Sequence, residues 1–201
     1  MTFTQSKTSI MAHRQCPKRL WLMVHDPDRA LIDAPDPLQA AAGAEVERHA
    51  RAAVDGAGTS PIIGRGLGAN PAGATAKAMA KHDVIFEAAI TGGGLTVYAD
   101  ILARDGDAWR IVEVKSGGSA KAHHIDDAAI QTWVAVQSGL AISRVEIAHL
   151  DTGWVYPGGD DRAGMVVTTD VSKKVFDLQD QVRLWVAAAS LKRDTGHLSI
   201  F

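Results

Sequence analysis

The sequence predicts an α/β fold, with a mixed central β-sheet flanked by helices on both faces. Three successive runs between Asp83 and Val114 are rich in Val, Ile and Leu, which is typical of neighbouring strands. A further apolar run at Arg144–Leu150 follows a segment whose apolar residues recur at helical spacing. Because strands and helices alternate in this way, the sheet should be covered on both sides.

Helices and a long loop are expected before the sheet. Helical spacing and abundant alanine indicate the helices, and clustered glycines and prolines indicate the loop. Pro17 should kink or break the first helix, which Thr8 or Ser9 can cap. The expected elements are a helix at Thr8–His25, a helix at Leu38–Val54, a loop at Asp55–Gly73, a short helix at Ala74–Lys81 and a strand at Asp83–Ile90.

Two apolar strands joined by a turn form the centre of the predicted sheet. Leu95–Ala103 and Trp109–Val114 are apolar on both of their faces, and Asp105–Ala108 between them has the composition of a turn. Strands of this kind should lie in the middle of a sheet. The expected elements after the hairpin are a helix at Ile125–Ser138, strands at Arg144–Leu150 and Met165–Thr169, and a helix at Val171–Leu191.

Three charged residues, Asp100, Glu113 and Lys115, interrupt these apolar strands or follow them directly. Residues two apart on a strand point to the same face, so Glu113 and Lys115 should share one face. A four-residue loop and a two-residue turn at Gly106-Asp107 give the same register, in which Asp100 lies directly opposite Glu113. Opposed carboxylates repel each other, since their Cβ atoms are about 5 Å apart.

A cation between the two carboxylates would make this arrangement stable. Buried charges are costly unless they are paired or bound to metal, and oxygen ligands suit Mg²⁺ or Mn²⁺ better than zinc. Lys115 would then stand beside the metal, and a divalent ion with a lysine can cleave a phosphodiester. The simpler alternative is a cross-strand ion pair between Asp100 and Lys115, with Glu113 in water at the strand end.

Asp100, then Glu113-Val114-Lys115, then a helix that carries Gln131, together resemble the PD-(D/E)XK nuclease superfamily. The sequence is most similar to its RecB-like and Cas4-like branch, and in particular to bacterial proteins with an uncharacterised DUF2779-type region. The resemblance implies a restriction-endonuclease-like core and an Mg²⁺- or Mn²⁺-dependent deoxyribonuclease, more typically an exonuclease than an endonuclease, acting on DNA ends or single strands. It also implies that the Val114 carbonyl joins the two carboxylates as a metal ligand, and that Gln131 orients the attacking water or the phosphate.

The resemblance extends to the predicted helix at Leu38–Val54, where members of the superfamily carry a histidine close to the metal. The matching run here is Gly43–Val46, and it is followed by Glu47 in the place of that histidine. Glu47 is therefore implied as a further metal ligand, with His49 as the alternative. The two lie about 200° apart on a helix, so they cannot both face the metal, and both could instead face solvent. Glu87, in the strand before the hairpin, is a secondary candidate.

A basic cluster on the first predicted helix and one later lysine are candidate DNA contacts. Arg and Lys side chains bind phosphate, and the family pattern has basic and aromatic residues after a Cys-Pro pair, as here after Cys16-Pro17. A solvated helix face would have the same composition, so both interpretations stay open. The candidates are Arg14, Lys18, Arg19 and Lys121.

Cys16 is the one cysteine of the chain. Cas4-like relatives use four cysteines to hold an iron–sulfur cluster, so no iron–sulfur cluster is expected here. We expect Cys16 to be a packed thiol.

The composition is that of an ordinary globular protein, with 46% hydrophobic and 22% charged residues, and 201 residues favour a single domain spanning 1–201. A net charge of −2 counts mildly against strong non-specific DNA binding, although a local basic groove is compatible with it. No signal-peptide core or membrane-spanning apolar run is evident, so we expect a cytoplasmic protein that does not bind a membrane.

Two other functions compete with the nuclease. A nuclease fold that no longer cuts could bind nucleic acid or a protein partner, and metal binding without cleavage would identify it. Alternatively, the apolar stripe of the predicted C-terminal helix, which includes Val175, Val182 and Trp185, could dock on a larger protein or on a second copy of the chain.

Overall fold

The computed structural model describes residues 5–29, 36–56, 58–66, 70–159 and 162–194. Its centre is a five-stranded sheet in the order β1-β2-β3-β4-β5. Neighbouring strands are antiparallel except β3 and β4, which are parallel, so the sheet is mixed, as predicted. The strands are β1 (Val84–Gly92), β2 (Leu95–Asp105), β3 (Ala108–Val114), β4 (Ile142–Leu150) and β5 (Val166–Asp170).

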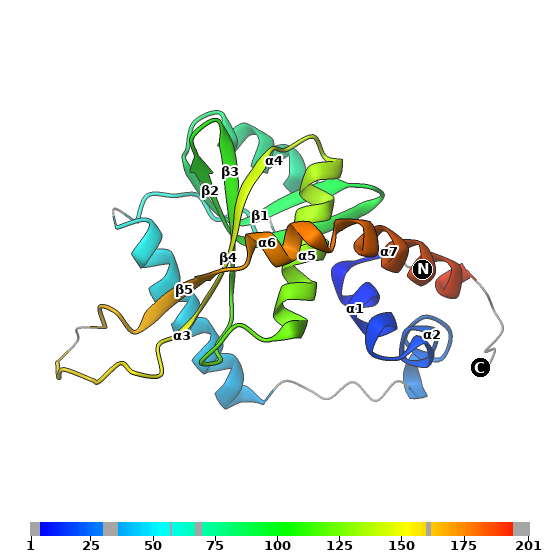
Figure 1. The fold of residues 1–201 in the computed structure, drawn as a ribbon, viewed down its shortest axis with the longest axis horizontal. Helices are drawn as coiled ribbons and strands as arrows, with labels where there is room; N and C mark the ends of the chain where they lie inside the picture. The colour runs from blue at the N-terminus through cyan, green and yellow to red at the C-terminus, as the bar shows by residue number, and fades with distance from the viewer. Residues whose placement is uncertain (1–4, 30–35, 57, 67–69, 160–161, 195–201) are drawn as a thin grey trace.

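Helices cover both faces of the sheet, which confirms the predicted α/β fold (Figure 1). α5 makes the crossover that the parallel strands β3 and β4 require, and α1, α6 and α7 pack around it. On the other face α3 packs against β3, β4 and β5. No helix in the described part of the chain has both the length and the apolar composition needed to cross a membrane. The helices are α1 (Lys7–Gln15), α2 (Pro17–His25), η1 (Pro27–Arg29), α3 (Pro37–Val54), α4 (Pro71–Met79), α5 (Ala122–Gln137), α6 (Ser172–Asp177) and α7 (Gln179–Asp194).

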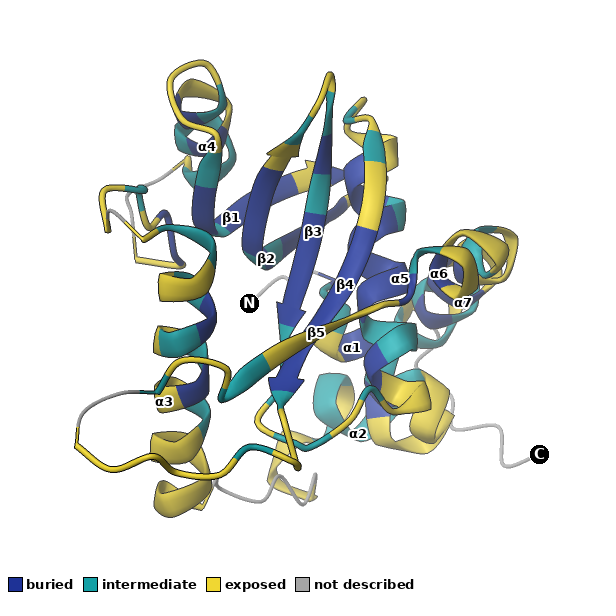
Figure 2. Ribbon diagram, turned by 60° about the vertical axis from the view of Figure 1, so that its left-hand side comes forward, coloured by how far each residue is buried: buried dark blue, intermediate teal, exposed yellow. Residues whose placement is uncertain are grey.

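The central strands are buried on both faces, as their apolar composition predicts (Figure 2). Ile101 and Leu102 are successive residues of β2 that point to opposite faces, and neither is exposed to solvent. Leu102 belongs to the larger core beneath α5, whereas Ile101 belongs to a smaller core that includes Ala50 of α3. Each large side chain of this kind contributes about 1.5–3 kcal/mol through its removal from water.

The predicted helix at Thr8–His25 is two helices. α1 ends at Gln15 and α2 begins at Pro17, because a proline at the first position of a helix needs no N–H partner. The predicted caps are wrong, since Ser6 caps α1 and forms reciprocal capping-box hydrogen bonds with Ser9. The prediction that Cys16 is a packed thiol is also wrong, because the break between the helices leaves it exposed.

The N-terminal segment is joined to the last described helix. The Gln5 side chain donates a hydrogen bond to the Val186 carbonyl (3.1 Å) and accepts one from the Ser190 hydroxyl (2.6 Å). Val182 and Trp185 of α7 are buried in the larger core. The apolar stripe of the C-terminal helix therefore serves, at these positions, to pack α7 onto the rest of the fold.

Candidate active site

The β2–β3 hairpin has the register that the sequence predicts. A two-residue turn joins the strands, and Gly106 in this turn takes a φ of +63°, which suits glycine. Paired residues run up the ladder as far as Ile101 and Val112. One residue further in the same register, Asp100 lies level with Glu113.

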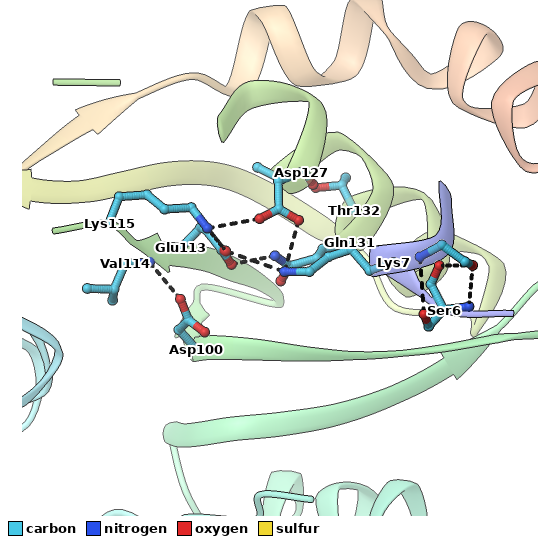
Figure 3. Close-up of polar contacts among 11 residues, drawn as sticks. Ser6, Lys7, Asp100, Glu113, Val114, Lys115, Asp127, Gln131 and Thr132 are labelled. Carbon is cyan, nitrogen blue, oxygen red and sulfur yellow. Dashed lines mark hydrogen bonds and ion pairs between the residues drawn. The ribbon is translucent and has the colours of Figure 1, made fainter. Parts of the chain in front are cut away.

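Glu113 is the most buried charged group of the site, at 2% exposure. Its Oε1 accepts a hydrogen bond from Lys115 Nζ at 2.5 Å and lies 3.4 Å from Lys7 Nζ. Its Oε2 accepts a hydrogen bond from the side-chain amide of Gln131 on α5. The predicted meeting of Glu113, Lys115 and Gln131 is therefore present (Figure 3).

Asp127, one helical turn before Gln131 on α5, completes the cluster. Its Oδ2 lies 2.9 Å from Lys115 Nζ, and its Oδ1 lies 2.9 Å from Lys7 Nζ. Lys115 thus pairs with Glu113 and Asp127 rather than with Asp100. A simple cross-strand ion pair between Asp100 and Lys115, which the sequence left open, is not formed.

Asp100 has fewer partners than the other carboxylates. Its Oδ2 accepts the backbone N–H of Val114 at 2.7 Å. Burial, and then the neighbouring Glu113, raise the pKa of Asp100 to about 8. Asp100 and Glu113 are adjacent, and the charge of Asp100 is poorly compensated. A bound cation would relieve the repulsion between the two carboxylates.

The electrostatics of the other two groups are set by their ion pairs. Burial would raise the pKa of Glu113, but Lys7 and Lys115 outweigh it and lower that pKa to about 2. Burial would likewise lower the pKa of Lys115, but Glu113 and Asp127 outweigh it and raise that pKa. Glu113 is therefore a carboxylate and Lys115 an ammonium group at neutral pH.

Gln131 carries an orphaned polar atom. It is fully buried, and its Oε1 has no hydrogen-bond partner among the described residues. Leaving such an atom unpaired is costly, and a bound cation or an ordered water would satisfy it. The amide of the same side chain binds Glu113, so this oxygen lies next to the carboxylate pair, and oxygen donors of these kinds fit Mg²⁺ or Mn²⁺. Within the described residues no three His, Cys, Asp or Glu side chains form a metal-ligand group, so such an ion would also need backbone, amide or water oxygens.

The structure does not bring Glu47, His49 or Glu87 to this carboxylate pair. Glu87 lies level with Asp100 in the register of β1 and β2, but its left-handed φ of +47° accompanies a hydrogen bond from Arg51 of α3 at 2.7 Å. The same guanidinium also binds Glu47. His49 Nε2 lies 3.0 Å from Oε1 of Glu45, one turn earlier on α3. Glu47 and His49 belong to α3 and Glu87 is held toward it, and this helix packs on the face of the sheet opposite α5.

Two of the predicted DNA contacts border a hollow of about 600 Å³ between α1, α2 and the start of α5. Arg14 lies there with its guanidinium stacked on Trp185 at 3.6 Å and paired with Asp126 at 2.6 Å. Arg19 lines the same hollow. The other two candidates, Lys18 and Lys121, are exposed near the ends of α2 and α5.

No role was assigned to Lys7 or to Asp127 from the sequence. A usable signal for Lys7 lay next to it, because Ser6 and Ser9 have the spacing of a capping box and predict a helix that starts at Lys7. No local pattern indicates the partners of Lys7, which are 106 and 120 residues away.

No family model and no curated protein matches this chain. A solved structure titled "Crystal structure of SSO0001" matches it with a TM-score of 0.47 and 14% identity. The match covers 92% of this chain and 77% of that one. Similarity at this level carries no argument about function.

Proposed function

We propose that this protein is a metal-dependent DNA nuclease, in which Asp100, Glu113 and Lys115 are the catalytic residues and Gln131 assists them. The observation that carries the proposal is the convergence of these four side chains, from β2, from the end of β3 and from α5, around the buried Glu113. A purely structural cluster would gain nothing from the poorly compensated Asp100 or from an orphaned amide oxygen.

Asp100 and Glu113, with the Val114 carbonyl and Gln131 Oε1, would hold Mg²⁺ or Mn²⁺. Such an ion, when bound, generates a nucleophilic water at neutral pH and neutralises charge on the phosphate. Glu47, His49 and Glu87 form no part of the proposed ligand set.

The side chains of the cluster divide the remaining work. Lys115 stabilises the negative charge that develops on the phosphoryl oxygens, a role that suits an ammonium group whose pKa is raised. That raised pKa favours electrostatic stabilisation over proton abstraction from water. The Gln131 amide orients the attacking water or the phosphate.

The substrate we propose is DNA, as single strands or ends, and the place of action is the cytoplasm. Arginine side chains beside an open hollow suit the phosphates and unpaired bases of a single strand. Arg14 and Arg19 would supply these contacts, and the exposed Lys18 and Lys121 would add phosphate contacts at the rim.

The test is a cleavage assay on labelled single- and double-stranded DNA, linear and circular, with Mg²⁺, with Mn²⁺ and with EDTA. The Lys115→Ala and Asp100→Asn variants should lose at least about 10²-fold in rate, the scale of one lost electrostatic contact to a transition state. Lys77→Ala is the matched control, because Lys77 is exposed on α4. Cleavage of linear but not circular DNA would identify an exonuclease.

Two results would contradict this assignment. If the Lys115→Ala variant cleaved DNA at the wild-type rate, Lys115 would have no catalytic role. A folded wild-type protein that binds Mg²⁺ in calorimetry but cuts no DNA would replace the nuclease with a binding module.

A further inference from the structure

Lys7 reaches the candidate active site from α1, and the mechanism proposed above assigns this lysine no role. It is the first residue of α1, and its Nζ lies 2.9 Å from Asp127 Oδ1 and 3.4 Å from Glu113 Oε1. Figure 3 shows Lys7 and Lys115 approaching these two carboxylates from opposite sides. Glu113 and Asp127 are thus held between two ammonium groups, of which the mechanism above employs one.

Rigid neighbours hold Lys7 in this place. The capping box fixes the start of α1, and Ile10 on the same helix is fully buried in the core. Arg14 pairs with Asp126 at 2.6 Å, which ties α1 to the helix that carries Asp127. The Lys7 side chain is 22% exposed, unlike that of a solvated surface lysine. Its ammonium group is therefore fixed in position, and the side chain keeps some contact with solvent.

The distances indicate which partner Lys7 would keep when a metal binds. In the cluster as it stands, the two lysines balance the charges of Glu113 and Asp127. Asp127 is the closer partner of Lys7, so this pair can persist when Glu113 turns to a divalent ion. Each ammonium group has three N–H donors, which leaves donors for a further acceptor.

A second observation marks the same place as built for a ligand. Gln131 Oε1 is fully buried without a hydrogen-bond partner in the described chain, and the amide of the same side chain binds Glu113. A ligand at the cluster would therefore meet an acceptor as well as two cationic donors. Such a mixture suits a metal-bound phosphate, in which cation and anion arrive together.

We propose that Lys7 binds a non-bridging oxygen of the substrate phosphate beside Lys115, and that Asp127 is the positioning residue that holds both ammonium groups. This inference rests on the proposed nuclease function and deepens it. The substrate class is a phosphodiester that is held between two lysines, one directly after β3 and one at the start of α1. Lysine suits this role as a compact charge that approaches phosphate from many directions.

The experiment compares Lys7→Gln and Lys7→Arg with the wild-type protein, with Lys77→Gln on the exposed face of α4 as the matched control. Steady-state cleavage of a labelled single-stranded oligonucleotide in Mg²⁺ gives kcat and KM separately. Fluorescence anisotropy of the same oligonucleotide with Ca²⁺ in place of Mg²⁺ gives its affinity without a need for turnover. Urea denaturation confirms that each variant is folded.

Lys7→Gln should weaken oligonucleotide binding and raise KM by at least about tenfold, the value of one hydrogen bond to a charged group. Lys7→Arg keeps the charge and should keep most of the affinity. Asp127→Asn should lower kcat, because both lysines lose their shared anchor, while the Mg²⁺ concentration for half-maximal activity stays unchanged.

Two outcomes would overturn the role of Lys7 while leaving the nuclease intact. One is unchanged binding and KM in Lys7→Gln. The other is a Lys7→Gln variant that turns over normally and needs a lower Mg²⁺ concentration than the wild type, which would make Lys7 a competitor of the metal instead of a substrate ligand.

Failure of the nuclease function would be visible separately. If the wild-type protein cuts no DNA, the anisotropy measurement still decides whether Lys7 binds phosphate. Oligonucleotide affinity that depends on Lys7 would support the phosphate site in a binding protein, and affinity that Lys7→Gln leaves unchanged would overturn it.

Discussion

Replacing Asp100 by asparagine should stabilise the metal-free protein, and increasingly so as the pH rises. Burial, and then Glu113, raise the pKa of Asp100 from 3.8 to about 8. In the unfolded chain this carboxyl ionises near pH 4, whereas in the folded protein it keeps its proton until about pH 8. The wild-type protein therefore loses stability between these values, and asparagine, which can still accept the Val114 N–H, removes the loss.

The size of the effect follows from the two pKa values. A difference of about four pKa units, at about 1.36 kcal/mol each, corresponds to about 6 kcal/mol. Relaxation and water entry lower the cost of a buried charge, so we expect about 2–4 kcal/mol above pH 8 and almost none near pH 4. Urea denaturation in EDTA across this range measures the difference in the free energy of unfolding between wild type and Asp100→Asn.

A matched control and a metal titration make this prediction specific. Asp107→Asn makes the same change to an exposed carboxylate in the turn of the same hairpin and is the matched control. Added Mg²⁺ should stabilise the wild type more than Asp100→Asn, because binding to the folded state alone adds to stability. A difference between wild type and Asp100→Asn that stays constant with pH would refute the reasoning.

Three further substitutions test the ion pairs of the site and the packing of two helices, each by urea denaturation. Glu113→Ala should lower the free energy of unfolding by about 3–5 kcal/mol, because it removes a fully buried carboxylate and leaves two partly buried ammonium groups short of a counterion; a loss below about 1 kcal/mol would contradict the buried ion pairs. Gly92→Ala should cost about 1–3 kcal/mol, since its Cβ would overlap the Val134 carbonyl of α5, and a neutral effect would mean that α5 packs less closely on β1. Gly43→Ala should instead stabilise the protein by about 0.5–1 kcal/mol, because a Cβ on this residue of α3 meets nothing within 4 Å; destabilisation would indicate an unseen contact there.

The hairpin could be predicted from the sequence because its geometry is local. The turn sets the register and the alternation of strand residues sets the face, so the positions of Asp100, Glu113 and Lys115 follow from a few neighbouring residues. Gln131 was predicted from the family resemblance, and it meets Glu113. The mixed sheet with helices on both faces was predicted by the same kind of local pattern.

The residues that were misplaced depend on distant contacts. Strand alternation puts Glu87 on the face of Asp100, but its backbone takes a left-handed φ and its carboxylate binds Arg51, 36 residues away. Glu47 is the exception, because it binds Arg51 four residues later on the same helix, a spacing that does indicate this partner. Lys7 was overlooked because the carboxylates that it binds lie on β3 and α5.

The hydrogen bonds between Gln5 and α7 affect the order in which parts of the fold can form while the chain is being synthesised. Gln5 leaves the ribosome 181 residues before its partner Val186. Contacts of such long sequence separation form late, after the segments between them have folded. The sheet with its carboxylate pair can thus assemble on a nascent chain before α7 is made, while Lys7, two residues after Gln5, gains its full support when the last described helix docks. A ribosome-stalled chain that ends before Gln179 would carry the hairpin without this support.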